Sequence, residues 1–197
     1  MTDSEKAPAE EKKPRPGATD ASGHPWVQTI RAALSDTVVS AKEFAGQVTV
    51  VVQKDAIARV ARHLKDDQDF KYCVDVTAVD WKDKSPRFEV VYHFYSFSKN
   101  ARIRVKCAAA DGEDVPSIAA VFLSSNWCER EIWDMFGIKF SGHPDLRRIL
   151  TWEGFNGFPL RKDFPLERID TGAAVYPEEW PEGGGPSQKD SNRKVVS

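Results

Sequence analysis

The stretch YCVDVTAVDWKDKSPRFEVVYHFYSFSKNARIRVKCA, residues 72–108, is the most informative about the fold of this chain. Apolar and polar side chains alternate along Tyr72–Val79 and Ala101–Ala108, and Phe88–Ser96 is rich in aromatic and β-branched residues. Such runs are typical of strands that bury one face. The stretch therefore predicts three consecutive strands, of which the last two form a hairpin.

Upstream of this stretch, the sequence predicts two more strands and two helices. The β-branched content favours strands at Val38–Phe44 and Gln47–Gln53, with a turn at Ala45-Gly46 between them. Val27–Leu34 is predicted to be a short helix. A second helix, which Asp55 can cap, has apolar residues at i, i+3, i+4 and i+7, namely Ile57, Val60, Ala61 and Leu64. This order favours an α+β fold of two layers, with helices on one face of a mixed five-stranded sheet.

Downstream of the sheet, the chain is expected to form two helices and then to become irregular. Pro116–Phe122 begins with a proline, which suits a first helical position, and predicts a short helix. Asn126 and Glu129 resemble a capping box, and Gly137 fits a helix C-terminus, so Trp127–Phe136 is predicted to be a helix. Glycines and prolines then occur too often for long regular elements.

Composition divides the chain of 197 residues into four parts. Residues 1–24 and 171–197 are polar and are expected to be flexible tails. Residues 25–140 are predicted to form the α+β domain, and residues 141–170 an extended segment that docks on partners. Roughly 140 residues are available for folding, which fits a single domain with one core.

Charge and motifs exclude several classes of function. With 28 basic and 30 acidic residues, the chain has no global field that would draw it to nucleic acid or to an anionic bilayer. Its apolar runs are far shorter than the roughly 18 to 20 residues that cross a bilayer. Residues 1–16 lack the apolar region of a secretory signal, so a cytoplasmic location is expected. The sequence holds no G-x-S-x-G, H-E-x-x-H or Walker A motif of an independent enzyme.

Three cysteines, Cys73, Cys107 and Cys128, are far apart in the sequence. Their number is odd and none belongs to a C-x-x-C motif, so neither a disulfide framework nor an iron–sulfur or zinc site is expected. Buried thiols are the favoured interpretation. His143, which precedes a proline, is expected to make a local hydrogen bond in a turn rather than to act as a base.

The functional signal lies in residues 128–166, CEREIWDMFGIKFSGHPDLRRILTWEGFNGFPLRKDFPL. Basic residues alternate there with aromatic ones, and this composition is typical of protein interfaces. The candidate partner-interface residues are Glu129, Arg130, Asp134, Arg147, Arg148, Trp152, Phe155, Arg161, Lys162 and Phe164. Left in water, so many aromatics would form a large apolar patch. The alternative is that the segment folds back and its aromatics pack on the chain's own domain.

The motifs EREIWDMFGIKF (129–140), GHPDLRRIL (142–150) and PLRKDFPL (159–166) resemble the signature of one protein family. It is the family of the 30 kDa subunit, designated C, of proton-pumping NADH:quinone oxidoreductase, or respiratory complex I. The upstream motif DVTAVDW (75–81) is similar to the same family, so the resemblance covers about residues 38–166. The chain departs from the family pattern at Trp152-Glu153 and at Phe158.

The resemblance implies a peripheral subunit on the cytoplasmic side of the inner membrane, bound to the membrane only through the complex. It implies that the chain packs beside two partners, the quinone-site subunit, designated D, and the iron–sulfur subunit, designated B. It also implies that this chain carries no cofactor, whereas FMN and iron–sulfur clusters lie in partner subunits. Charge reversal at Arg147 or Arg161 is then expected to impair assembly.

Two alternatives stay open at the level of sequence. Membrane-bound hydrogenase and formate hydrogenlyase complexes use subunits related to this family. A nucleic-acid module would explain Arg102, Arg104 and Lys106 on one strand face. The near-neutral charge and the acidic residues at 111–114 weaken this second alternative.

Overall fold

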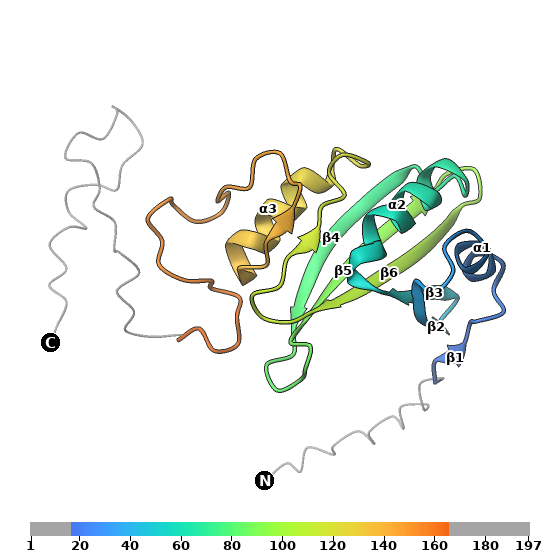
Figure 1. Cartoon of the computed structure of the whole chain (residues 1–197), viewed down its shortest axis with the longest axis horizontal. Coiled ribbons are helices and arrows are strands. Elements are labelled where there is room, and N and C mark those ends of the chain that lie inside the picture. The colour runs from blue at the N-terminus through green and yellow to red at the C-terminus, as the bar shows by residue number, and fades with distance from the viewer. Residues whose placement is uncertain (1–16, 166–197) are drawn as a thin grey trace, which may run out of the picture.

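A computed structural model describes residues 17–165 of the chain (Figure 1). Its main sheet has six strands in the order β1-β2-β3-β6-β5-β4. Strand β3 runs parallel to β6, and the other neighbours are antiparallel, so the sheet is mixed. The strands are β1 (Thr19–Asp20), β2 (Val38–Phe44), β3 (Gln47–Val52), β4 (Tyr72–Asp80), β5 (Phe88–Ser96) and β6 (Ala101–Ala109). The α+β class and the five longer strands are confirmed.

The sixth strand, β1, corrects two predictions. Thr19 pairs with Glu43 and Asp20 with Lys42 at the free edge of β2, and the following Ala21 is buried. The sheet therefore has six strands rather than five, and the part of the predicted 1–24 tail from residue 17 onward is ordered. A two-residue strand is too short to show the alternation by which strands are found in a sequence. Residues 1–16 and 166–197, with their predicted tails, lie outside the described residues.

One face of the sheet is covered by helices, as the sequence predicted (Figure 1). Helix α1 (Pro25–Ala33) and helix α2 (Ile57–Asp66) join the inward side chains of the strands in one core. All four residues that defined the apolar stripe of α2 are buried, which offsets the entropy cost of ordering the helix. A 3₁₀ turn at Lys54–Ala56 precedes α2, and Asp55 lies within this turn, so its predicted role as the cap is wrong.

The predicted turn between β2 and β3 is confirmed. Phe44 pairs with Gln47, which leaves two residues in the loop. Both loop residues have positive φ angles, 49° at Ala45 and 74° at Gly46. This is the backbone of a type I′ hairpin turn, for which glycine is suited because it has no Cβ.

The predicted helix at Pro116–Phe122 is wrong. Val115–Pro116 forms a short strand, β7, which pairs in parallel with β8 (Phe140–Ser141) in a second sheet. The N–H of Val115 donates to the carbonyl of Lys139, and that of Ser117 to the carbonyl of Ser141, both at 2.9 Å. These bonds to residues about 24 positions away in the sequence override the local preference of proline for a helix start.

Helix α3 (Ser125–Phe136) lies between β4 and the irregular segment that follows it (Figure 1). It ends as predicted, at Gly137, whose φ of 76° is left-handed and whose N–H donates to the carbonyl of Trp133. The predicted capping box is wrong, because the N-cap residue is Ser124 and its side chain makes no capping bond. The Glu129 side chain is instead buried inside the chain.

Candidate functional site

Asp134 of α3 binds the irregular segment to the domain. Its carboxylate accepts hydrogen bonds from the backbone N–H groups of Ile149, Leu150 and Thr151, at 3.1, 2.8 and 2.8 Å, and another from the Thr151 hydroxyl. Asp134 is fully buried. Burial alone would raise the pKa of Asp134, but these hydrogen bonds lower it to about 2. The residue is thus a buried carboxylate that fixes the backbone of residues 149–151.

Arg148 balances this buried charge. One guanidinium nitrogen lies 2.6 Å from Asp134, and the other donates to the carbonyls of Phe155 and Gly157 at 2.9 and 3.3 Å. The guanidinium also lies 5.7 Å from the centres of three aromatic rings, those of Trp133, Phe155 and Phe158. An arginine whose two terminal nitrogens are hydrogen-bonded between aromatic rings is a strong structural anchor. It closes the loop from residue 148 to residue 157.

A second anchor holds the end of the described segment on the sheet. Arg161 donates to the carbonyl of Phe136 at 2.6 Å. Its two terminal nitrogens donate to the two carboxylate oxygens of Asp111, both at 3.0 Å. Close by, Arg87 bridges Asp80 and Asp163, at 2.8 and 2.7 Å. Hydrogen bonds from Arg87 lower the pKa of Asp80 to about 2. Arg87 therefore ties Asp163 to the end of the β4–β5 hairpin, and Arg161 ties the segment to α3 and to the turn after β6.

A glycine after α3 allows an aromatic ring of the segment to pack closely against the backbone. The ring of Phe158 packs on Gly137, where a Cβ would lie 2.6 Å from the nearest ring carbon. A methyl group there would force the Phe158 ring to shift, and the left-handed backbone also favours glycine. The N–H of Leu160 donates to the carbonyl of Met135 at 3.0 Å. The segment is thus bound along the last turn of α3.

The two remaining predicted residues of α3 are also used internally. Arg130 donates to the carbonyls of Arg147 and Arg148 at 3.1 and 3.2 Å and lies over the ring of Trp127. Glu129 is fully buried and accepts from Ser117 at 2.5 Å and from the N–H of Ile118 at 2.8 Å. Burial raises the pKa of Glu129 to about 7, although these hydrogen bonds act to lower it.

Five of the residues predicted at a partner interface make contacts within the chain. Glu129, Arg130 and Asp134 are buried inside the chain, and Arg148 and Arg161 are mostly buried and bonded within it. These five side chains bind groups of the chain itself, and a partner contact at any of them stays a prediction. Phe155 and Phe164 are half-buried and stack on each other at 6.0 Å. Arg147, Trp152 and Lys162 are exposed, and a partner interface at these three remains a prediction.

Five exposed apolar side chains occur just before α3, on α3 and along the bound segment. We call these five residues the outer surface. Its exposed fractions are 85% for Leu123, 60% for Trp127, 63% for Leu150, 45% for Trp152 and 53% for Leu160. Four of these five were missed by sequence reasoning. The arginine-rich motifs indicated charged candidates, whereas no pattern in the sequence indicates that these leucines are exposed.

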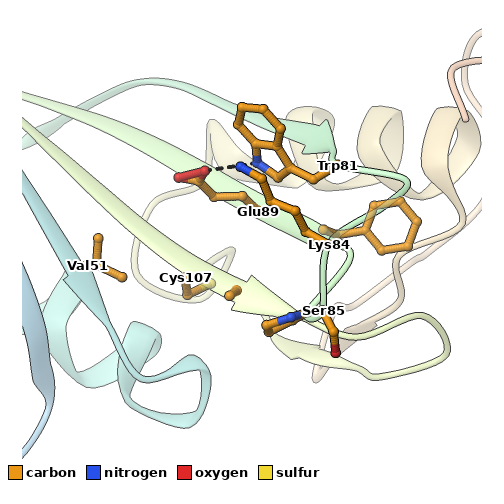
Figure 2. A pocket seen from close by; sticks show the side chains of 9 residues that line it. Val51, Trp81, Lys84, Ser85, Glu89 and Cys107 are labelled. Atoms are coloured by element: carbon orange, nitrogen blue, oxygen red, sulfur yellow. Dashed lines mark hydrogen bonds between the residues drawn. The ribbon is translucent and has the colours of Figure 1, made fainter. Parts of the chain in front are cut away.

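A hollow of about 300 Å³ lies beside the turn between β4 and β5 (Figure 2). Lys84 lies 3.7 Å from the ring centre of Trp81, and the indole N–H of Trp81 donates to Glu89 at 3.2 Å. Cys107 also lines the hollow, but burial raises the pKa of this thiol to about 12, so it stays protonated. Figure 2 shows no nucleophile held against a base among the labelled side chains.

Neither a metal site nor a membrane span is found within residues 17–165. This part of the chain contains no group of three or more His, Cys, Asp or Glu side chains that could hold a metal ion. Among its helices, none combines the length and the apolar content needed to cross a membrane. Cys73 and Cys107 are buried free thiols, as predicted, and Cys128 is half-buried. His143 makes the expected local hydrogen bond, since the N–H of Asp145 donates to its Nδ1 at 3.0 Å.

A domain with an internally bound segment and an apolar outer surface is typical of proteins that pack against other proteins. Comparison with known families agrees with this class. A model of the respiratory-chain NADH dehydrogenase 30 kDa subunit matches residues 50–170. The chain belongs to this family, and the resemblance in its sequence motifs is confirmed.

Curated relatives support the same family. The C subunit of NADH-quinone oxidoreductase from Rhodobacter capsulatus is 54% identical over 65% of each chain. The protein of the same name from Paramagnetospirillum magneticum is 53% identical, over 61% of this chain and 62% of the relative. That from Parvibaculum lavamentivorans is 48% identical over 70% of each chain. The chain thus matches slightly less than two thirds of the length of the first two relatives.

A solved structure shares the fold. It is a chain from the membrane-bound sulfane sulfur reductase, an archaeal respiratory membrane complex. The TM-score is 0.61, and the match covers 73% of this chain and 86% of the other. At 24% sequence identity, the likeness concerns the fold alone.

Proposed function

We propose that this chain is a structural subunit of an NADH:quinone oxidoreductase and holds no redox centre itself. It lies in the peripheral arm on the cytoplasmic side of the inner membrane. Electrons pass from NADH through FMN and iron–sulfur clusters of partner subunits to quinone. The chain contributes a rigid surface against which the quinone-site subunit and the iron–sulfur subunit pack.

The outer surface is the observation that carries this proposal. Buried ion pairs and backbone hydrogen bonds use Asp134, Arg148 and Arg161 to fix the segment to α3. Its outward leucines and tryptophans are left without an apolar neighbour within residues 17–165 large enough to bury them. A preorganised surface loses little entropy on association, because its loops are already ordered. Family membership and the names of the curated relatives favour a quinone reductase over a hydrogenase complex.

A double variant, Leu150→Glu with Leu160→Glu, tests the proposal. Both side chains point to water, so the chain should fold normally. Burying two carboxylates against partners costs several kcal/mol, by the usual penalty for burying unpaired charges, so the complex should lose this subunit. We expect the purified variant chain to melt at the same temperature as the parent, while membranes expressing it contain little assembled complex.

The matched control is Val39→Glu. Val39 is also 63% exposed, like Leu150, but it lies on β2, four strands away from β4, on which α3 packs. This variant should assemble at the parental level. Normal assembly of the double leucine variant would refute the proposed docking role of the outer surface.

A further inference from the structure

The face of the sheet that the helices leave open carries a second set of residues with no role in the proposed docking. In the strand register, Arg104 of β6 lies between Thr49 of β3 and His93 of β5. One step along, Arg102 lies beside Tyr95, which pairs with Tyr72 of β4. Because successive side chains of a strand point to opposite faces of the sheet, these residues lie on the face away from the buried side chains.

Two arginines on this face form no ion pair with any acidic residue of the described range 17–165. The Arg104 guanidinium donates to the side-chain oxygens of Gln47 and Thr49, at 3.0 and 3.3 Å, which orient it without neutralising its charge. Arg102 is exposed and lies over the ring of Tyr95 at 5.5 Å. None of the ion pairs formed within residues 17–165 includes either arginine. By contrast, Lys106 on the same strand is paired with Glu89 at 2.6 Å.

The two arginines line a hollow of about 240 Å³, together with His93 and Val74. Asp75 pairs with His93 in the register, but its carboxylate accepts from the Cys128 thiol at 3.9 Å. Burial, followed by the charge of Arg104, lowers the pKa of His93. The hollow therefore combines positive charge with an imidazole that burial and the neighbouring arginine keep neutral. An incoming carboxylate would relieve the mutual repulsion of Arg102 and Arg104.

Exposed aromatic side chains adjoin the hollow. Phe97 is 72% exposed and lies edge-on to Tyr95, with 4.8 Å between ring centres, and 5.7 Å from the ring of Tyr72. Tyr72 and Val74 are themselves nearly half exposed. Aromatic rings next to unpaired arginines have the composition of interface hot spots.

We propose that an acidic segment of another subunit of the same complex lies across this open face. One of its carboxylates occupies the hollow between Arg102 and Arg104, and its apolar groups pack on Tyr72, Tyr95 and Phe97. The inference rests on the proposed function, because it takes the chain to be part of an assembly. It adds a second contact surface, on the face away from the helices.

Charge complementarity favours an acidic protein segment over a nucleic acid. Binding to a nucleic acid backbone neutralises several phosphates in a row. Within residues 17–165, this face offers two guanidinium groups without an ion-pair partner, because the charge of Lys106 is already balanced by Glu89. The chain as a whole has a formal charge of −2. A single carboxylate with apolar neighbours matches the hollow and its aromatic border.

Hydroxyl-radical footprinting of the full chain, free and within the complex in native membranes, tests the inference. Tyr72 and Phe97 report on the open face, and Trp127 and Trp152 report on the outer surface, since all four are exposed and aromatic. We expect oxidation of Tyr72 and Phe97 to fall several-fold on assembly. Undiminished oxidation of these two, with Trp127 and Trp152 protected, would overturn this inference and leave the proposed function standing. Undiminished oxidation of all four would contradict both.

A charge reversal tests the chemistry of the partner. Arg102→Glu should restore oxidation of Tyr72 and Phe97 in the complex, or release a normally folded chain from it, while Arg62→Glu on the helical side should do neither. Protection that survives Arg102→Glu unchanged would overturn the acidic partner. Protection that disappears when the membranes are treated with ribonuclease would do the same and would identify an RNA.

Discussion

Two carboxylates on one helix show how their surroundings decide their charge. Asp134 and Glu129 are both fully buried on α3. Burial would raise the pKa of Asp134, but hydrogen bonds from the Thr151 hydroxyl and from three backbone N–H groups lower it to about 2. Glu129 accepts from Ser117 and Ile118 and forms no ion pair within residues 17–165, and burial raises its pKa to about 7. The motif at 129–134 indicated that these residues matter, but their charge state depends on segments 117–118 and 148–151, which local sequence does not place beside them.

A pH dependence of stability follows from Glu129. Its pKa is about 7 in the folded chain against 4.5 as the ordinary value, so between these two the folded state holds a proton that the unfolded state releases. Protonation of Glu129 therefore stabilises the folded state fully below pH 4.5, and this stabilisation is lost as the pH rises through 7. Glu129→Gln, which cannot ionise, should lack this loss. The free energies of unfolding of parent and variant should diverge by on the order of 3 kcal/mol between pH 4.5 and 8.

Urea unfolding at several pH values measures this divergence. The control is Glu131→Gln, an exposed position on the same helix, which should keep the parental slope. Parallel curves for the parent and the Glu129 variant across this range would contradict the raised pKa.

Among the helices and strands, regular alternation was predictable and long-range pairing was not. The three strands of residues 72–108 and the stripe of α2 have the periods that burial of one face imposes. Strand β7 depends on partners about 24 residues away, and β1 on only two residues, so neither leaves a periodic signal. For the segment after residue 141, glycines and prolines correctly predicted irregular structure. Its attachment to α3 is set by Asp134, through bonds that span about 15 residues.

Asp134→Asn should loosen that attachment. The asparagine side chain has no charge to pair with Arg148. Its NH₂ group also faces the backbone N–H groups that donated hydrogen bonds to the carboxylate. Breaking a buried ion pair costs about 3 to 5 kcal/mol, so we expect a lower free energy of unfolding and faster amide exchange at Ile149, Leu150 and Thr151. Hydrogen-exchange mass spectrometry measures both the loss and its location.

Asp145→Asn is the control for this variant. Its ion pair with Arg147 is exposed on both sides, and such pairs contribute less than about 1 kcal/mol. Exchange at residues 149–151 should stay at the parental rate. Equal exchange in the Asp134 and Asp145 variants would show that the carboxylate does not hold the segment.

For the molecule as a whole, many of the contacts that the sequence assigned to a partner are made inside the chain. The composition of arginine and aromatics in residues 128–166 was interpreted as an interface, yet most of the arginines bind the chain's own carbonyls and carboxylates. The same residue types stabilise interfaces and interiors, because both need directional donors on large side chains. Only the geometry separates the inner arginines from the outer leucines and tryptophans.

A photo-crosslinking amino acid at position 160 tests whether the outer surface docks on a partner subunit. With benzoylphenylalanine in place of Leu160 in the full chain, irradiation of membranes should yield a covalent adduct with the quinone-site or the iron–sulfur subunit. The same group in place of Val39 should give no such adduct. Absence of any adduct from position 160 in membranes where the complex is assembled would contradict docking through this surface.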